Sequence, residues 1–228
     1  MSSLLLAYAL MTIKKSTTHN ASISSNHYHH GDLRQTLLDA AQQLIAQHGI
    51  EGLSLRKLAE QTGVSRTAPY HYFKDKQDLL SAIAAQAFAQ RAQQAAQRFA
   101  DPRLNAAQCF RAFFMDYIEF ATQSPAMYEL MFGSTLWRGA SPSEELKQQA
   151  YPCFQQQLAM IRQWQQQGLL PAQQEPLRLA QITWATLHGI ARLVNDGVYA
   201  DSQHISAMVD CAVALFLGNG NNRAPVKP

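Results

Sequence analysis

The sequence predicts an all-α fold in which a small N-terminal helix-turn-helix domain is joined by a long helix to a larger helical C-terminal domain. Apolar residues recur at helical spacing along most of the chain, and short breaks containing Gly or Pro separate the helical segments. Almost no segment alternates as a half-buried strand does. The 228 residues, of which 47% are hydrophobic, suffice for one or two buried cores. No run reaches the roughly 18 apolar residues of a membrane span.

The N-terminal domain is predicted from three helices in succession. The first covers residues 33–48, ends at Gly49 and has an apolar face made of Leu33, Leu37, Ala41, Leu44 and Ile45. Ser54 then caps a short helix, Gly63 supplies a tight turn, and Ser65 caps a second short helix. Two short helices around a glycine turn are typical of a helix-turn-helix that reads DNA.

Polar side chains interrupt the apolar spacing of the second short helix, so we expect this helix to face a polar partner. Arg66, Thr67 and His71 carry donors and acceptors suited to base edges in the major groove. The candidate DNA-binding residues also include phosphate anchors and caps, and the full set is Ser54, Arg56, Ser65, Arg66, Thr67, Tyr70, His71, Tyr72 and Lys76. An ordinary solvated helix is the alternative. Pro69 lacks the amide that would bond back to the Ser65 carbonyl, which predicts a distorted first turn.

A long connecting helix, capped by Asp75 and ending near Asp101, is predicted after the helix-turn-helix. Further helices are predicted over residues 104–122, 125–132, 143–167, 176–196 and 202–217. The predicted organisation is a disordered arm over 1–27, a DNA-binding domain over 28–76, a connecting helix over 77–100, a ligand-binding and dimerisation domain over 101–218, and a flexible tail over 219–228. Translation from Met1 and from Met11 both remain open.

The last two predicted helices are apolar around most of their circumference. A helix of this kind must be buried on both sides, and in so small a domain we expect a second subunit to supply one of the covers. The predicted interface residues of this homodimer are Leu187, Ile190, Ala191, Val194, Ile205, Val209, Val213 and Phe216.

Aromatic and Met residues recur at helical spacing in the C-terminal domain, and two compatible interpretations stand. They are plain core, or they line a pocket between helices for a small hydrophobic or aromatic effector. The candidate pocket residues are Phe110, Phe114, Tyr117, Met127, Tyr128, Met131, Trp164, Trp184 and His188. His188 stands on an otherwise apolar helix, and a histidine satisfied within the core or interface is the alternative to a ligand contact.

Neither a metal site nor a catalytic site is predicted, and no cofactor is expected. The 3 cysteines are far apart and form no Cys-x-x-Cys pair. His27, His29 and His30 are close in sequence but lack the fixed spacing and the fourth ligand of a zinc site, so their role stays open. The chain has no Gly-rich phosphate loop, nucleophile elbow or His-Glu-x-x-His pair, which argues against an enzyme.

The positive charge gathers in the half of the chain that carries the helix-turn-helix. Residues 1–100 contain 10 Lys and Arg against 6 Asp and Glu, whereas the remainder contains 9 against 10. This placement suits binding to a polyanion.

Three runs of residues carry a resemblance to a known family. Gly63-Val64-Ser65, Tyr70-His71-Tyr72-Phe73, and Lys76 with Leu79-Leu80 together resemble the signature of the TetR family of bacterial transcriptional regulators. Trp184-Ala-Thr-Leu-His188-Gly189 resembles the Trp-His-Gly motif of one TetR subgroup, and the segment over 28–34 resembles the lead-in of that subgroup.

The scattered cysteines fit a reducing cytoplasm. The resemblance implies a ligand-responsive repressor. Such a protein binds a palindromic double-stranded DNA operator as a homodimer, and its last two long helices form a four-helix bundle with those of a second subunit. An activator, or an effector-independent DNA-binding protein of the same fold, is the alternative.

Overall fold

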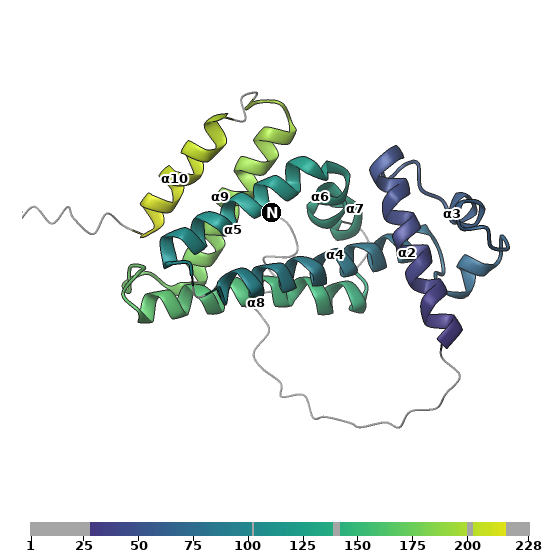
Figure 1. Ribbon diagram of the computed structural model, residues 1–228, viewed down its shortest axis with the longest axis horizontal. Helices are drawn as coiled ribbons and strands as arrows, with labels where there is room; N and C mark the ends of the chain where they lie inside the picture. The colour runs from purple at the N-terminus through teal and green to yellow at the C-terminus, as the bar shows by residue number, and fades with distance from the viewer. Residues whose placement is uncertain (1–27, 102, 139–141, 200–202, 218–228) are drawn as a thin grey trace, which may run out of the picture. The chain divides into compact units, whose positions relative to one another are not determined.

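A computed structural model describes residues 28–101, 103–138, 142–199 and 203–217. The predicted arm over 1–27 and tail over 219–228 lie outside the described residues. The described part of the chain is built from helices without a strand (Figure 1), which confirms the all-α prediction. It divides into two compact units. Unit 1 comprises the described residues up to Ala87 together with Ala126–Gln148, and unit 2 comprises Phe88–Pro125 and the described residues from Gln149 onward.

Unit 1 contains the helix-turn-helix. Its elements are α2 (Tyr28–His48), α3 (Leu55–Thr62), the 3₁₀ helix η1 (Ala68–His71), the first half of α4 (Lys76–Phe99), α6 (Pro125–Phe132), α7 (Ser134–Trp137) and the start of α8 (Glu144–Gln166). The predicted apolar spacing holds in α2 and α4, since both helices bury their regularly spaced residues. Fully buried side chains include Leu37, Ile45, Leu58, Phe73, Leu79 and Ile83.

The helix ends of unit 1 follow from their capping residues. The Ser54 hydroxyl accepts a hydrogen bond from the Lys57 amide at 3.2 Å and thereby caps α3. The Asp75 carboxylate accepts from the Asp78 amide at 2.9 Å, while the Asp78 carboxylate accepts from the Lys74 amide at 3.0 Å. The first bond caps the start of α4, and the second ties its first turn to the residue before that cap.

The second helix of the helix-turn-helix is a correction to the sequence prediction. Instead of an α-helix capped by Ser65, the structure has a turn followed by the short 3₁₀ helix η1. The Ala68 amide donates to the Ser65 carbonyl at 3.0 Å and the Tyr70 amide to the Thr67 carbonyl at 3.1 Å, both in the tighter spacing of a 3₁₀ helix. Pro69 has no N–H to donate to the Ser65 carbonyl in an α-helical bond. The segment therefore forms the shorter-range hydrogen bonds of a 3₁₀ helix instead.

Other differences from the predicted helices are small. The helix predicted over 125–132 is found with those bounds as α6, but the short helix α7 directly after it was not predicted. The buried Trp137 indole N–H donates to the Met131 carbonyl at 2.6 Å, which holds α7 against the end of α6. A four-residue helix is too short to leave a periodic signal in a sequence.

Unit 2 packs around α5. It contains the second half of α4, α5 (Ala106–Gln123), most of α8, α9 (Pro176–Asn195) and α10 (Gln203–Leu217). Helix α5 contacts both α9 and α10, and in Figure 1 these three helices lie side by side. The side chains that fill this core include Phe110, Phe114, Leu158, Ile161, Leu187, Ala191 and Val209.

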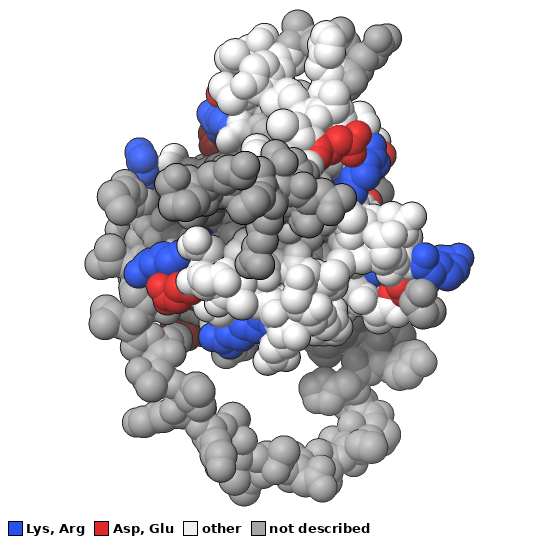
Figure 2. All heavy atoms as spheres, turned by 90° about the vertical axis from the view of Figure 1, so that its left-hand side faces the viewer, with Lys and Arg blue, Asp and Glu red and all other residues white. Residues whose placement is uncertain are grey.

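Charged side chains on the surface of unit 2 mostly lie in pairs of opposite sign. Arg98 on α4 binds Asp116 on α5 at 2.9 Å, and Arg111 on α5 binds Asp210 on α10 at 2.6 Å. Figure 2 shows one face of the molecule on which Lys and Arg side chains lie beside Asp and Glu side chains. A face of mixed charge does not favour a polyanion.

No helix within the described residues is long and apolar enough to cross a membrane.

One buried thiol, Cys109, and one half-buried thiol, Cys153, provide a test of this packing. Burial raises the pKa of Cys153 to about 11 and also raises the pKa of Cys109. The Cys153 thiol donates to the Phe88 carbonyl of α4 at 3.3 Å. Because the thiolate is the reactive form, we expect iodoacetamide to leave both residues unmodified in the native protein at neutral pH and to modify both after unfolding in urea. Mass spectrometry of the digested protein reads out the result, and labelling of Cys153 before urea is added would contradict the contact of α8 with α4.

Candidate functional site

The helix-turn-helix holds its recognition segment on a buried scaffold. Leu55, Leu58 and Ala59 of α3 are buried. Gly63 ends α3 in the left-handed region at φ 69°, a conformation that glycine adopts without steric cost. The chain then reverses into η1, where Pro69 is buried. The scaffold is therefore fixed from both ends of the turn.

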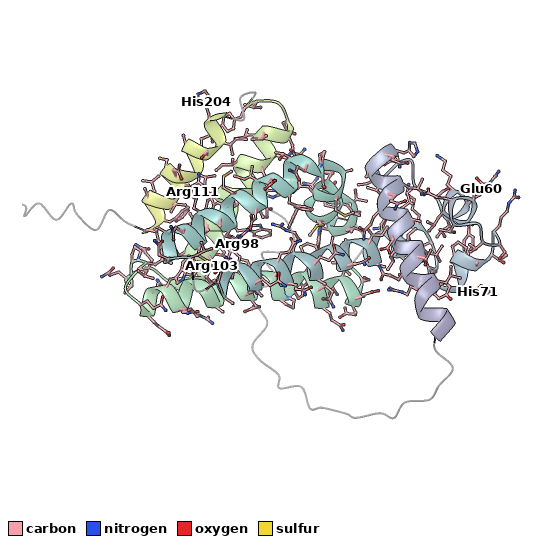
Figure 3. The ribbon with its side chains drawn as sticks, in the orientation of Figure 1. Glu60, His71, Arg98, Arg103, Arg111 and His204 are labelled. Atoms are coloured by element: carbon pink, nitrogen blue, oxygen red, sulfur yellow. The ribbon has the colours of Figure 1, made fainter. Side chains whose placement is uncertain are left out.

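The residues predicted to read bases are all exposed at this segment. Arg66, Thr67 and His71 are exposed, and Tyr70 is 58% exposed despite its large ring. Figure 3 shows His71 at the surface of the segment that carries η1. The Ser65 and Thr67 hydroxyls lie 3.1 Å apart and hydrogen-bond to each other. The Ser65 hydroxyl thus bonds within the turn before η1 and does not cap an α-helix.

The predicted phosphate anchors surround these residues. Lys76 is half-buried at the first position of α4, and Tyr72 is half-buried with its ring centroid 6.5 Å from that of Phe73. Arg56 pairs with Glu60 at 3.1 Å, but both side chains are more than half exposed. An exposed pair of this kind contributes about 0–1 kcal/mol, so a phosphate can displace Glu60 at little cost.

Two further cations accompany the predicted set. Lys57 on α3 and Lys74 between η1 and α4 are exposed, and neither is among the site residues predicted from the sequence. The Lys57 ammonium donates to the Gly52 carbonyl at 3.2 Å. Their positions one residue after Arg56 and two before Lys76 were a signal in the charge pattern, since Lys and Arg gather around the helix-turn-helix.

The candidate pocket residues fall into two groups, one in each unit. In unit 2, the Phe110 ring lies 5.0 Å from Phe114 and 5.2 Å from Trp164, with edge-to-face geometry. Phe216 of α10 joins them, with its centroid 5.9 Å from that of Phe110. Edge-to-face rings at these distances are a well-packed aromatic cluster. We call Phe110, Phe114, Trp164 and Phe216 the aromatic cluster.

The other candidate pocket residues lie around or apart from this cluster. Tyr117 is buried, and its hydroxyl lies 3.4 Å from Nδ1 of His188 on α9. The Trp184 ring lies 6.3 Å from that of His188. The remaining three candidates, Met127, Tyr128 and Met131, belong to α6 in unit 1.

Most predicted interface residues are buried within one chain. Leu187, Ile190, Ala191, Ile205, Val209 and Val213 are at most 9% exposed, whereas Val194 and Phe216 are half-buried. The exposed apolar residues of the same two helices are different ones. Ile182 is 57% exposed on α9 and Leu215 is 77% exposed on α10, and small exposed residues stand near them in sequence, namely Ala185, Ala207, Cys211 and Ala214. We call these six residues the α9–α10 face.

Comparison with known proteins follows the same division of the chain. Residues 37–83 match the model of the bacterial regulatory proteins of the tetR family, and residues 110–216 match the model of the tetracyclin repressor-like C-terminal domain. The chain belongs to the tetR family. The first match spans the helix-turn-helix, and the second spans the aromatic cluster and the α9–α10 face.

Similarity to curated relatives is confined to the helix-turn-helix region. The transcriptional repressor AcnR of Corynebacterium glutamicum is 47% identical over 51 residues, which are 22% of this chain and 27% of AcnR. The transcriptional regulator AcrR of Shigella flexneri is 46% identical over 52 residues, or 23% of this chain and 24% of AcrR. This tetR-family chain therefore spans about a quarter of the length of the curated relatives it matches.

Solved structures match over most of the chain. A protein of unknown function from Rhodococcus sp. RHA1 has a TM-score of 0.72 and 27% identity over 85% of this chain and all of its own. The transcriptional regulator FadR from Bacillus subtilis, solved in complex with stearoyl-CoA, has a TM-score of 0.66 and 15% identity, over 81% of this chain and 98% of its own. The second likeness shows the fold alone.

Proposed function

We propose that this tetR-family chain is a dimeric transcriptional repressor that binds a palindromic DNA operator and responds to a small-molecule effector. One observation carries the proposal: exposed Arg66, Thr67 and His71 stand on a buried helix-turn-helix scaffold, in a segment similar to that of curated repressors. An activator or an effector-independent regulator of the same fold is the alternative. Neither enzymatic chemistry nor a cofactor is part of the proposal, and it places the protein in the cytoplasm with its DNA.

The recognition segment divides its work between bases and phosphates. Arg66 and His71 carry side chains long enough to reach base edges from an exposed turn, and Thr67 contacts bases at closer range. Lys76 at the start of α4 and Tyr72 at the end of η1 act as phosphate anchors. The other anchors are Ser54, Arg56, Lys57, Tyr70 and Lys74. The phosphate contacts set the orientation, and the base contacts set the sequence preference.

Dimerisation uses the α9–α10 face. Exposed large apolar side chains such as Ile182 and Leu215 are costly in water, and small neighbours such as Ala185 and Ala214 allow a second helix pair to approach closely. The buried set predicted from the sequence, such as Leu187 and Val209, supports the same helices from inside the protomer. In a two-fold dimer, two recognition segments then face the DNA at a fixed spacing.

The effector region we propose is the aromatic cluster with Tyr117, Trp184 and His188 beside it. The rings in the cluster are closely packed, so a ligand enters by separating them, and it must be apolar to replace their contacts. Tyr117 and His188 offer one polar contact. Trp184, His188 and Gly189 also form the Trp-His-Gly pattern, and membership in that subgroup is part of the proposal. The FadR of Bacillus subtilis, which is similar in fold, was solved in complex with stearoyl-CoA, a ligand with a long apolar acyl chain on a charged CoA group.

DNA binding is tested by selecting operator DNA from genomic fragments with the purified protein. We expect a pseudo-palindrome whose half-sites lie about 34 Å, or a multiple of this distance, apart. Arg66→Ala should relax the sequence preference, whereas Lys76→Ala should weaken binding to every sequence and reduce the salt slope by about one. Fluorescence anisotropy at several salt concentrations measures both effects.

The control for these variants removes an arginine elsewhere. Arg162 is exposed on α8, and Arg162→Ala should leave affinity and specificity unchanged. Selected DNA without two-fold symmetry would contradict the proposal that a dimer binds the operator. Lys76→Ala protein that binds as tightly as the parent would remove Lys76 from the interface.

A further inference from the structure

A polar groove in unit 2 stands apart from the aromatic cluster. It has a volume of about 830 Å³ and lies between the second half of α4 and helix α5. Its lining includes Gln94, Gln97, Gln123 and Ser124 in addition to charged residues, and none of the four aromatic-cluster residues lines it. Figure 3 labels Arg98 and Arg103, two of its lining residues. Its volume is in the range of small-molecule sites.

Two of the three arginines in the groove are neutralised by carboxylates. The Arg98 guanidinium donates to both Asp116 oxygens at 3.0 and 3.1 Å. The Arg103 guanidinium likewise donates to both Asp101 oxygens at 2.9 and 2.7 Å, and these hydrogen bonds lower the pKa of Asp101 to about 2. Bidentate pairs of this kind satisfy each other and leave little charge for a ligand.

Arg91 differs from these two arginines. Its guanidinium carbon lies 4.8 Å from the centre of the Phe120 ring. It donates to two uncharged acceptors, the Gln94 side-chain oxygen at 3.1 Å and the Asp116 main-chain carbonyl at 3.2 Å. Among the described residues, no carboxylate forms an ion pair with it. Arg91 is half-buried, and this burial lowers the pKa of its guanidinium.

Glu119 is the matching acid. It is exposed on α5, next to Phe120, and its carboxylate accepts a hydrogen bond from the Gln123 amide at 2.8 Å. In the described part of the chain, no Lys, Arg or His forms an ion pair with Glu119. The acids and bases of the groove lining thus cancel in two internal pairs, which leaves one cation, Arg91, and one anion, Glu119.

We propose that this groove binds a small zwitterion of the amino-acid class, with its carboxylate on Arg91 and its ammonium on Glu119. A guanidinium has five N–H donors, and Arg91 uses two of them in these bonds, so donors remain for a bidentate carboxylate. A ligand that is only anionic would be attracted by the Arg91 guanidinium but repelled by the Glu119 carboxylate. A ligand with both charges satisfies both groups, and Gln97 and Ser124 remain to bond its polar side chain. This inference does not rest on DNA binding.

The test uses the full chain and measures binding directly. Each common L-amino acid is added at millimolar concentration, and the melting temperature of the protein is followed, because a ligand that binds only the folded state raises it. We expect at least one amino acid to raise the melting temperature, while its amide and its deaminated acid, which each lack one charge, have a smaller effect. Calorimetry with that amino acid then gives the affinity.

The variants distinguish a zwitterion from other ligands. Arg91→Gln should weaken binding at least about tenfold, since it removes a charged hydrogen-bond partner. Glu119→Gln should weaken it a few-fold, because Glu119 is exposed. Arg162→Gln, outside the groove, should change nothing. If no amino acid binds, or if Glu119→Gln tightens binding as it would for a simple anion, the proposal is overturned.

Discussion

Val209→Glu is expected to destabilise unit 2 strongly. Val209 lies on α10 and is 0% exposed within one protomer, so the substitution places a carboxylate where no water reaches it. Most substitutions lower the free energy of unfolding by less than the burial of an unpaired charge does. We therefore expect this substitution to lower it by at least about 4 kcal/mol. Circular dichroism with urea titration measures this loss, together with the amount of soluble protein.

A matched control lies on the same helix. Leu215→Glu introduces the same side chain at a position that is 77% exposed, and it should leave the helical circular dichroism spectrum of the protein unchanged. If Val209→Glu protein unfolds at the same urea concentration as the parent, α10 does not pack on the core of its own protomer.

Leu215→Glu should nevertheless convert the dimer into a monomer. In the proposed dimer, the α9–α10 face of one protomer covers that of the other, and a glutamate at position 215 would then be buried without a partner. Monomers lose bivalent contact with the operator, so affinity for the full palindrome should fall by about 10²–10⁴, to the affinity of a half-site. Analytical ultracentrifugation measures the assembly, and fluorescence anisotropy with full and half operators measures the binding.

The same substitution elsewhere provides the comparison for this prediction. Leu169 is 38% exposed between α8 and α9, so Leu169→Glu adds the same charge away from the α9–α10 face. This variant should remain dimeric and bind the full operator as the parent does. A dimeric Leu215→Glu protein would place the interface on another surface.

The helices could be predicted from the sequence because their apolar spacing and their caps are local signals. Asp75 and Gly63 mark a helix start and a helix end in the structure, as expected. The form of the recognition segment could not be predicted as well. Ser65 is a good cap in general, but Pro69 removes an α-helical hydrogen bond four residues later, and the segment closes as a 3₁₀ helix.

The spacing of apolar residues predicted some parts of the candidate sites and not others. Arg66, Thr67 and His71 were found because polar residues interrupt an apolar pattern, and exposure follows from that. In a helix that is apolar all round, no pattern separates the side that faces its own protomer from the side left exposed. The burial of Leu187 and the exposure of Ile182 are decided by how α9 packs on α5, which is a tertiary property. For the same reason the sequence did not indicate that the candidate pocket residues divide between two units.

Helix α4 contains neither Gly nor Pro over its 24 residues, so nothing in its sequence favours a kink. Lys76 and Arg91 are 15 residues apart on it, which at 1.5 Å per residue is about 22 Å of helix length. A helix that moves as one rigid element acts as a lever arm. A tilt of about 5° around the level of Arg91 would carry the first turn sideways by about 2 Å, comparable to the range over which a hydrogen bond is made or lost. A modest rearrangement beside Arg91 would thus suffice to misalign Lys76 with a phosphate.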